Sequence, residues 1–151
     1  MAQMNTSIKI HWNGAMQGAG RIEGTELGVA IAIPASFGGS GAGTDPKSLL
    51  VSAAASCYAM TLIAMLEAKK LPVAGLAMHC NASESKDAGV SIDYDVRLLL
   101  SSDATQAQLD ATRPLIQAAD TVCAIGNLLR TAGYRIEAQG QVATIVEDMA
   151  N

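Results

Sequence analysis

The sequence predicts an α+β fold, because strand-like and helix-like segments occupy separate stretches of the chain. Alternating apolar and polar residues fill the first part, and a long uncharged apolar stretch follows. Further alternating stretches then stand before and after two helical ones. A chain of 151 residues suits one compact domain, which we expect to cover residues 1–151.

Three strands are expected at the start of the chain. The first alternates apolar and polar residues, as a half-buried strand does, and Asn13-Gly14 after it is a hairpin signal. A turn at residues 24–26 separates the next two strands, and a loop rich in Gly and Ser follows them. The expected strands cover residues 7–12, 17–23 and 27–33.

A long helix is expected next. Asp45 is a good N-cap, Pro46 suits the first helical position, and the helix should run to about Lys69 before Pro72 ends it. Residues 48–66 carry no charge and are long enough to span a bilayer on length alone. Their serines and threonine, and the strands on both sides that need a buried partner, favour a buried central helix instead.

The remainder is predicted to pair two strands, then form helices, then add a last strand. Pro114 should interrupt the first of these helices, and Gly133 should close the second. The expected elements are strands at 73–82 and 90–100, helices at about 104–119 and 121–132, and a strand at 134–146.

Composition limits the kind of protein this is. Half of the residues are hydrophobic and only 16% are charged, which favours a buried subunit interface. A net charge of −4 without a basic cluster argues against nucleic-acid binding. The first residues lack the basic and apolar regions of a signal peptide, so we expect a cytoplasmic protein, in which cysteines are reduced, metal-bound or catalytic.

Two of the three cysteines stand in helical contexts. Cys57 lies in the apolar helix between small residues, and Cys123 lies near the start of a later helix, where the helix dipole favours a thiolate. By position alone, inert packing is the stronger interpretation of either thiol, because free cysteine is among the most buried residue types. Cys80 alternates along a strand and is interpreted as core. Its neighbour His79 faces the other way, and no metal-ligand spacing occurs, so we expect neither metal nor cofactor.

A thiolate at Cys57 would need a stabilising group, because burial raises the pKa of a thiol. A nearby cation would lower that pKa again. Arg21 is the most interesting candidate, because the glycines beside it permit close approach of the backbone. The alternative is that Arg21 is an ordinary exposed strand residue paired with Glu23 or with a carboxylate on a neighbouring strand.

Over nearly its whole length the sequence resembles the OsmC/Ohr family of osmotically inducible and organic hydroperoxide resistance proteins. The likeness rests on Gly43-Thr-Asp-Pro46, on Ala-Ser-Cys57, on Cys123-Ala-Ile and on the glycine-flanked Arg21. The resemblance implies an OsmC-like fold with antiparallel sheets and a long buried central helix, in an intertwined homodimer. It also implies a thiol-dependent peroxidase that reduces organic hydroperoxides, with hydrogen peroxide as a further candidate substrate, and that needs no cofactor.

The resemblance assigns a role to each site residue. Cys57 attacks the peroxide and becomes a sulfenic acid, Cys123 resolves it as an intrachain disulfide, and Arg21 stabilises the thiolate and orients the peroxide. An external dithiol, for which a lipoyl protein is one candidate, then reduces the disulfide. Two departures stand out, because Lys47 replaces the usual acidic residue and Ala124 the usual proline after the second cysteine. They leave open a noncatalytic redox-sensing or ligand-binding dimer with the same fold, or a purely structural subunit.

Overall fold

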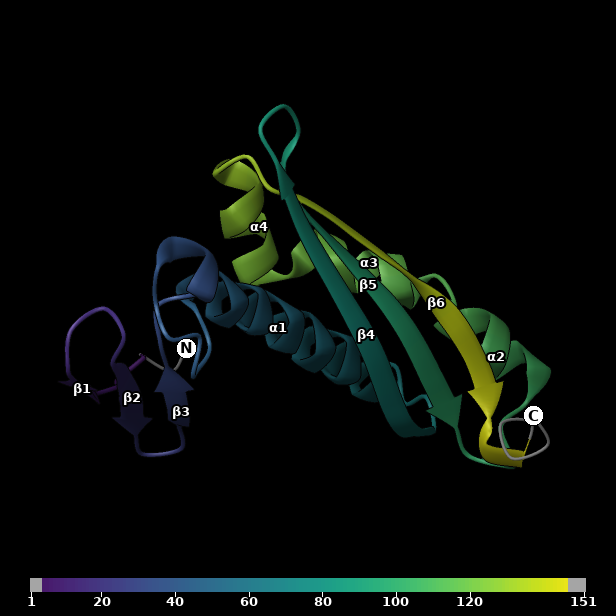
Figure 1. The fold of residues 1–151 in the computed structure, drawn as a ribbon. Coiled ribbons are helices and arrows are strands. Elements are labelled where there is room, and N and C mark those ends of the chain that lie inside the picture. Colours follow the sequence, from purple (N-terminus) through teal and green to yellow (C-terminus); the bar gives the residue numbers. More distant parts are fainter. Residues whose placement is uncertain (1–3, 147–151) are drawn as a thin grey trace. The chain divides into compact units, whose positions relative to one another are not determined.

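A computed structural model describes residues 4–146 of the chain (Figure 1). It divides into two compact units, Met1–Leu50 and Val51–Asn151, which are described separately below. The predicted α+β class is confirmed. In chain order the elements are β1 (Ile8–Asn13), β2 (Ala19–Gly24), β3 (Gly28–Ile31), the short 3-10 helix η1 (Ala35–Phe37), α1 (Pro46–Ala68), β4 (Val73–Ser85), β5 (Gly89–Leu100), α2 (Gln106–Thr112), α3 (Leu115–Val122), α4 (Ala124–Thr131) and β6 (Arg135–Thr144).

The N-terminal unit is a three-stranded antiparallel sheet of β1, β2 and β3. All three strands form where the alternation predicts them. Because side chains alternate along a strand, Ile8, Ile10 and Trp12 share one face of β1, and all three are substantially exposed. The indole N–H of Trp12 donates to the carbonyl of Ala15 at 3.2 Å. This sheet therefore has an apolar face that the described residues of its own unit leave open.

The helix α1 begins as predicted. The Asp45 carboxylate accepts from the Ser48 backbone N–H at 3.1 Å and from the Ser48 hydroxyl at 2.5 Å, which caps the first turn. The helix ends at Ala68, and Lys70 then takes a left-handed conformation with φ 56°. The Leu71 N–H bonds back to the Leu66 carbonyl at 3.0 Å, which closes the last turn.

Only one stripe of α1 is buried. It consists of Ala54, Tyr58, Leu62 and Leu66, which recur every fourth residue and are fully buried in the core. Another face is equally apolar but exposed, and Met60 on it is 72% exposed. By length and composition α1 could cross a membrane, but its Tyr58–Leu66 stripe packs in the core as the central helix of a globular domain does.

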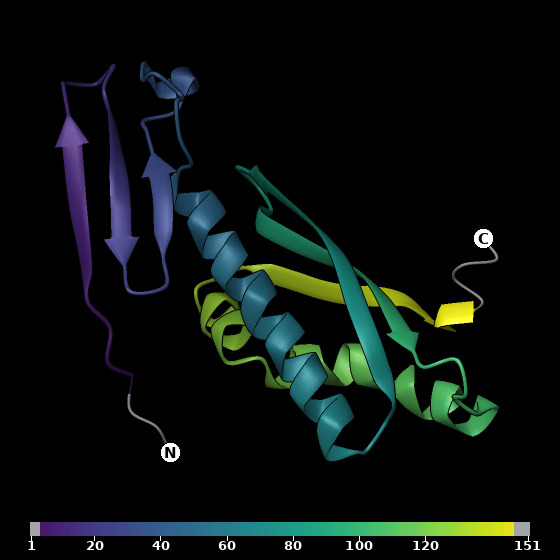
Figure 2. The ribbon, with the colours of Figure 1, turned by 90° about the horizontal axis from the view of Figure 1, so that it is seen from below.

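The C-terminal unit has a second three-stranded sheet in the order β4-β5-β6 (Figures 1 and 2). The β4–β5 pair is antiparallel, but β6 runs parallel to β5, with Ile92 opposite Ile136. The expectation of purely antiparallel sheets is therefore corrected at this pair. The reason lies in the connection, because α2, α3 and α4 carry the chain back to the end of the sheet where β5 began.

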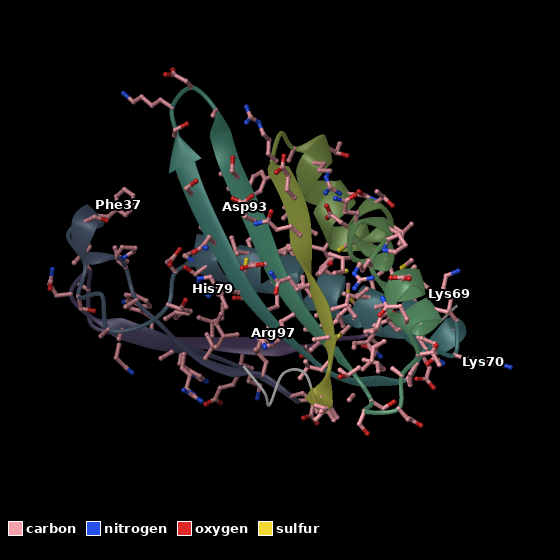
Figure 3. The ribbon with its side chains drawn as sticks, turned by 90° about the vertical axis from the view of Figure 1, so that its right-hand side faces the viewer. Phe37, Lys69, Lys70, His79, Asp93 and Arg97 are labelled. Atoms are coloured by element: carbon pink, nitrogen blue, oxygen red, sulfur yellow. The ribbon has the colours of Figure 1, made fainter. Side chains whose placement is uncertain are left out.

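The two faces of this sheet differ in character. Along β5, Ile92, Tyr94, Val96 and Leu98 are buried, and the residues between them are exposed. Figure 3 labels three of the exposed polar residues on the strands, namely His79, Asp93 and Arg97. The core therefore lies between the apolar face of the sheet and helices α1, α3 and α4.

The helices after β5 start and stop at recognisable signals. Thr105 and Gln108 form a reciprocal capping box at the start of α2, and Pro114 separates α2 from α3 as predicted. The next helix starts three residues later than expected. Cys123 has extended backbone angles, φ −67° and ψ 117°, and is the N-cap of α4 rather than a residue within it.

Candidate active site

Two thiols from distant parts of the sequence meet in the core of the C-terminal unit. Cys57 lies on α1 next to the buried stripe and is itself half-buried, whereas Cys123 is fully buried between α3 and α4. Both are free thiols. Cys123 lowers the pKa of Cys57, and Cys57 raises the pKa of Cys123, as expected for a thiol pair in which Cys57 carries the charge. The structure therefore brings together the two cysteines that the resemblance singles out.

The pKa of Cys57 is lowered from its ordinary value. Burial acts to raise the pKa, but several donors around the sulfur outweigh it. The largest is the backbone N–H of Ile125, followed by the Cys123 S–H, the Thr61 hydroxyl and the backbone N–H of Ala124. The Thr61 hydroxyl also donates to the Cys57 carbonyl at 2.7 Å, so its single hydrogen serves either the carbonyl or the sulfur.

The pKa of Cys123 shifts the other way. Burial raises it, and so does donation of its S–H to Cys57, while the N–H groups of Gly126 and Ile125 oppose the shift without reversing it. A helix start was expected to favour a thiolate at Cys123. Instead, the pKa of Cys57 is the one that is lowered, whereas burial raises the pKa of Cys123, the more deeply buried thiol.

An ion pair fixes the junction that carries Cys123. Arg130 on α4 contacts the Asp120 carboxylate at 2.7 Å and donates to the Asp120 carbonyl at 3.1 Å. It also donates to the Ile136 carbonyl of β6 at 2.9 Å and to the Asn127 side chain at 2.9 Å. Sequence reasoning missed this pair, although an acid three residues before Cys123 and an arginine seven after it were visible.

Two stacked tyrosines lie in the same core as the thiols. The rings of Tyr58 and Tyr94 have centroids 4.8 Å apart, and the Tyr58 hydroxyl donates to the Ile116 carbonyl at 2.7 Å. Burial, and then the Asp120 charge, raises the pKa of Tyr58 well above its ordinary value. Both tyrosines therefore stay neutral near neutral pH, and they contribute packing rather than acid or base chemistry.

Arg21 belongs to the other unit, in β2. Its Nε lies 3.4 Å from the Glu23 carboxylate, and both side chains are about half exposed. This is the pairing that the sequence left open as the alternative, and the role of Arg21 toward Cys57 stays a prediction. Cys80 is half-buried against the core, and burial, followed by the charge of Asp93, raises its pKa, which fits packing. Within residues 4–146 no three potential metal ligands gather.

Comparison with known proteins identifies relatives of this chain. A family model described as OsmC-like protein matches residues 38–139. The uncharacterized protein YmaD of Bacillus subtilis is 31% identical over 134 residues, which cover 86% of this chain and 89% of that protein.

Solved structures share the fold at lower identity. An organic hydroperoxide resistance protein OsmC from Legionella pneumophila is 20% identical with a TM-score of 0.61, covering 95% of this chain and 98% of that one. An OsmC-like protein from Mycoplasma pneumoniae has 18% identity and a TM-score of 0.62, with 94% and 99% covered. The organic hydroperoxide resistance protein OhrB of Bacillus subtilis has 17% identity and a TM-score of 0.56, with 90% and 97% covered. Taken with the family match and the curated relative, these likenesses show that the chain belongs to the OsmC-like protein family.

Proposed function

We propose that the protein is a cysteine-based peroxidase that reduces organic hydroperoxides. The observation that carries the proposal is the pairing of two free thiols in one core, Cys57 with a lowered pKa and Cys123 with a raised one, each acting on the other. A thiolate is the reactive form of cysteine, and a second thiol in contact with it is what a resolving cysteine requires. Membership of a family that includes hydroperoxide resistance proteins supports a redox role on peroxides.

The proposed reaction has three steps. The Cys57 thiolate attacks one peroxide oxygen, the O–O bond breaks, and the alkoxide takes a proton and leaves as an alcohol. Cys57 is then a sulfenic acid. Cys123 loses its proton and attacks the Cys57 sulfur, the S–O bond breaks, and the hydroxyl leaves as water when it takes up a proton. An external dithiol reduces the resulting disulfide by thiol–disulfide exchange.

Arg21 and the assembly complete the proposal. Arg21 is the candidate to orient the peroxide and to add positive charge near the thiolate, which requires it to exchange its partner Glu23. A homodimer is supported by two open apolar surfaces, the Ile8–Trp12 face of β1 and the Met60 face of α1. Cys57 packs against an apolar core, and apolar surroundings at the reacting sulfur favour alkyl hydroperoxides over hydrogen peroxide. We place the reaction in the cytoplasm, where dithiol reductants are abundant.

One stoichiometric experiment tests the peroxidase. Reduced protein is mixed with one equivalent of an alkyl hydroperoxide, and free thiols and intact mass are followed over seconds. We expect loss of two thiols and a mapped Cys57–Cys123 disulfide. The Cys57→Ser variant should consume no peroxide while keeping its assembly state, and Cys80→Ser should react as the wild type does.

The alternative is a noncatalytic redox-sensing or ligand-binding dimer. The observation that favours it is the Arg21–Glu23 pair, which occupies the only guanidinium that we assign to the thiolate. If the thiols stay unreacted for minutes in the presence of the peroxide, the peroxidase proposal is rejected and this alternative is supported.

A further inference from the structure

Cys123 is the single residue between two helices, and its backbone is held from both sides. Helix α3 ends at Val122 and α4 begins at Ala124, so the extended Cys123 forms the whole connection. Its N–H donates to the Asp120 carbonyl at 3.4 Å, and its carbonyl accepts from the Asn127 N–H at 2.9 Å. The place of the Cys123 thiol therefore depends on how the end of α3 and the start of α4 are held together.

One side chain, Arg130, binds the residues on both sides of this connection. Its Nη1 donates to the Asp120 carbonyl at 3.1 Å and to the Asn127 side-chain oxygen at 2.9 Å. Its Nη2 contacts the Asp120 carboxylate at 2.7 Å and donates to the Ile136 carbonyl of β6 at 2.9 Å. The planar guanidinium presents these donors in a fixed fork, so it holds α3, α4 and the sheet in one arrangement.

A second side chain of α4 reaches back in the same way. The Asn127 amide donates to the Thr121 carbonyl at 2.9 Å, across Cys123 to the last turn of α3. The Asp120 charge also depends on Arg130, because within the described residues the Asp120 Oδ1 atom is buried without a hydrogen-bond partner. Two side chains thus close over the residue that carries the second thiol.

We propose that Arg130 is a positioning residue for the resolving step, which holds Cys123 where it can close a bond to Cys57. The inference rests on the proposed function and assigns Arg130 to the closing step alone. Cys57 is carried by α1, so a shift of Cys123 leaves the attack of Cys57 on the peroxide unchanged. Bond closure is sensitive to placement, since a shift of about 1 Å can cost about 100-fold in rate.

Arg130→Lys separates positioning from charge. The lysine keeps a positive charge beside Asp120, but its ammonium is a point charge without the planar fork, so it does not reproduce all four contacts. Arg113→Lys is the matched control, because Arg113 pairs with Asp110 of α2 and both side chains are half exposed. Both variants keep the net charge of the protein.

The first test uses glutathione and no peroxide. Reduced full-length protein is equilibrated in buffers of defined glutathione and glutathione disulfide, alkylated, and mapped for the Cys57–Cys123 disulfide. Glutathione disulfide is the oxidant, and each protein disulfide that forms releases two glutathione thiols. The equilibrium constant should fall about tenfold in Arg130→Lys and stay unchanged in Arg113→Lys. A purely stabilising role would affect the reduced and oxidised protein alike and would leave this constant unchanged.

The second test follows the two steps of the reaction with cumene hydroperoxide and dimedone, which traps a sulfenic acid. Loss of the Cys57 thiol should be as fast in Arg130→Lys as in the wild type. The ratio of dimedone adduct to Cys57–Cys123 disulfide should rise about tenfold. Asn127→Ala covers the case in which Arg130→Lys does not fold, because Asn127 is exposed and alanine suits a helix. It should shift both measurements in the same direction, by less.

Wild-type values of both measurements in Arg130→Lys and in Asn127→Ala would overturn the inference. The two proposals fail in different ways. A wild type that forms the disulfide with glutathione but ignores the peroxide would remove the peroxidase and leave the role of Arg130 to stand on the first test. A wild type that forms no Cys57–Cys123 disulfide under either condition would overturn both.

Discussion

Arg130 and Asp120 hold the turn between α3 and α4, which carries Cys123, in place. The guanidinium contacts the carboxylate at 2.7 Å, and the same side chain donates to the Asp120 carbonyl at the end of α3 and to the Ile136 carbonyl on β6. Asp120 is 8% exposed, so its charge is largely removed from water. One arginine therefore joins three elements around the turn that carries Cys123.

Removing this arginine should destabilise the fold strongly. Arg130→Met leaves the Asp120 carboxylate buried without its partner, and loss of one member of a buried pair costs about 3 kcal/mol. Urea unfolding of the reduced protein measures the loss. Arg113→Met is the control, because the Arg113–Asp110 pair is half exposed and is worth about 0.5 kcal/mol. Equal losses in the two variants would show that the Arg130 network contributes little.

Removal of the hydroxyl group from each stacked tyrosine in turn gives two variants whose stabilities can be compared. Tyr58→Phe leaves the buried Ile116 carbonyl without its donor and should cost about 1.5 kcal/mol of unfolding free energy. In the part of the chain that the structure describes, the Tyr94 hydroxyl has no hydrogen-bond partner, so Tyr94→Phe should be neutral or stabilising. Thermal unfolding of both variants checks this, and a larger loss in Tyr94→Phe would contradict the assignment.

The three thiols should react with alkylating agents in a fixed order. Only the thiolate reacts, so a thiol with a lowered pKa reaches half-maximal rate at lower pH. The pKa of Cys57 is lowered, and burial raises the pKa of both Cys80 and Cys123. Mass mapping after brief iodoacetamide treatment at neutral pH should therefore find Cys57 modified first. Modification of Cys80 before Cys57 would contradict this order.

The lowered pKa of Cys57 also affects stability. A group whose pKa is lower in the folded state stabilises the fold above its unfolded pKa, about 8.5 for a thiol, and loses that contribution as the pH falls through the folded value. The reduced wild type should therefore gain stability relative to Cys57→Ser between pH 6 and pH 9. Urea unfolding at the two pH values measures the difference, and a constant difference would argue against a lowered pKa.

A charge placed on the exposed face of α1 tests whether that face lies in a homodimer interface. Met60→Lys places a charge at a position that is 72% exposed in one chain, so the isolated fold should tolerate it. Burial of the same side chain against a second copy would make the charge costly, and the dimer should weaken by tenfold or more, about 1.4 kcal/mol. Sedimentation measures the assembly state. Gln139→Lys on the polar sheet face is the control, and a Met60→Lys protein that assembles normally would remove this face from the interface.

The sequence predicts most elements because their signals are local. The cap at Asp45, the break at Pro114 and the alternation along β5 each lie within a few residues of the feature they determine. The direction of β6 was missed, because alternation is the same in parallel and antiparallel strands. That direction follows from the path of the connection, which no single segment encodes.

The candidate site was proposed from its side chains, and its backbone groups were not anticipated. Cys57 and Cys123 were proposed because thiols are conspicuous, and the family resemblance pointed to their pairing. A cation was expected to lower the Cys57 pKa, but the largest lowering contribution comes from the N–H of Ile125. Every residue except proline carries such a group, so nothing in the sequence distinguishes the amides that face a sulfur.

Trp12 gives the two units separate optical signals. It is the only tryptophan of the chain, it lies on the apolar face of the N-terminal sheet, and the stacked pair Tyr58–Tyr94 lies in the C-terminal core. Excitation of the indole alone therefore reports on the N-terminal sheet and on whatever covers it. The tyrosines, which include the stacked pair, lie in the C-terminal unit, so their near-ultraviolet dichroism adds a signal from that unit to the indole fluorescence of the same unlabelled sample.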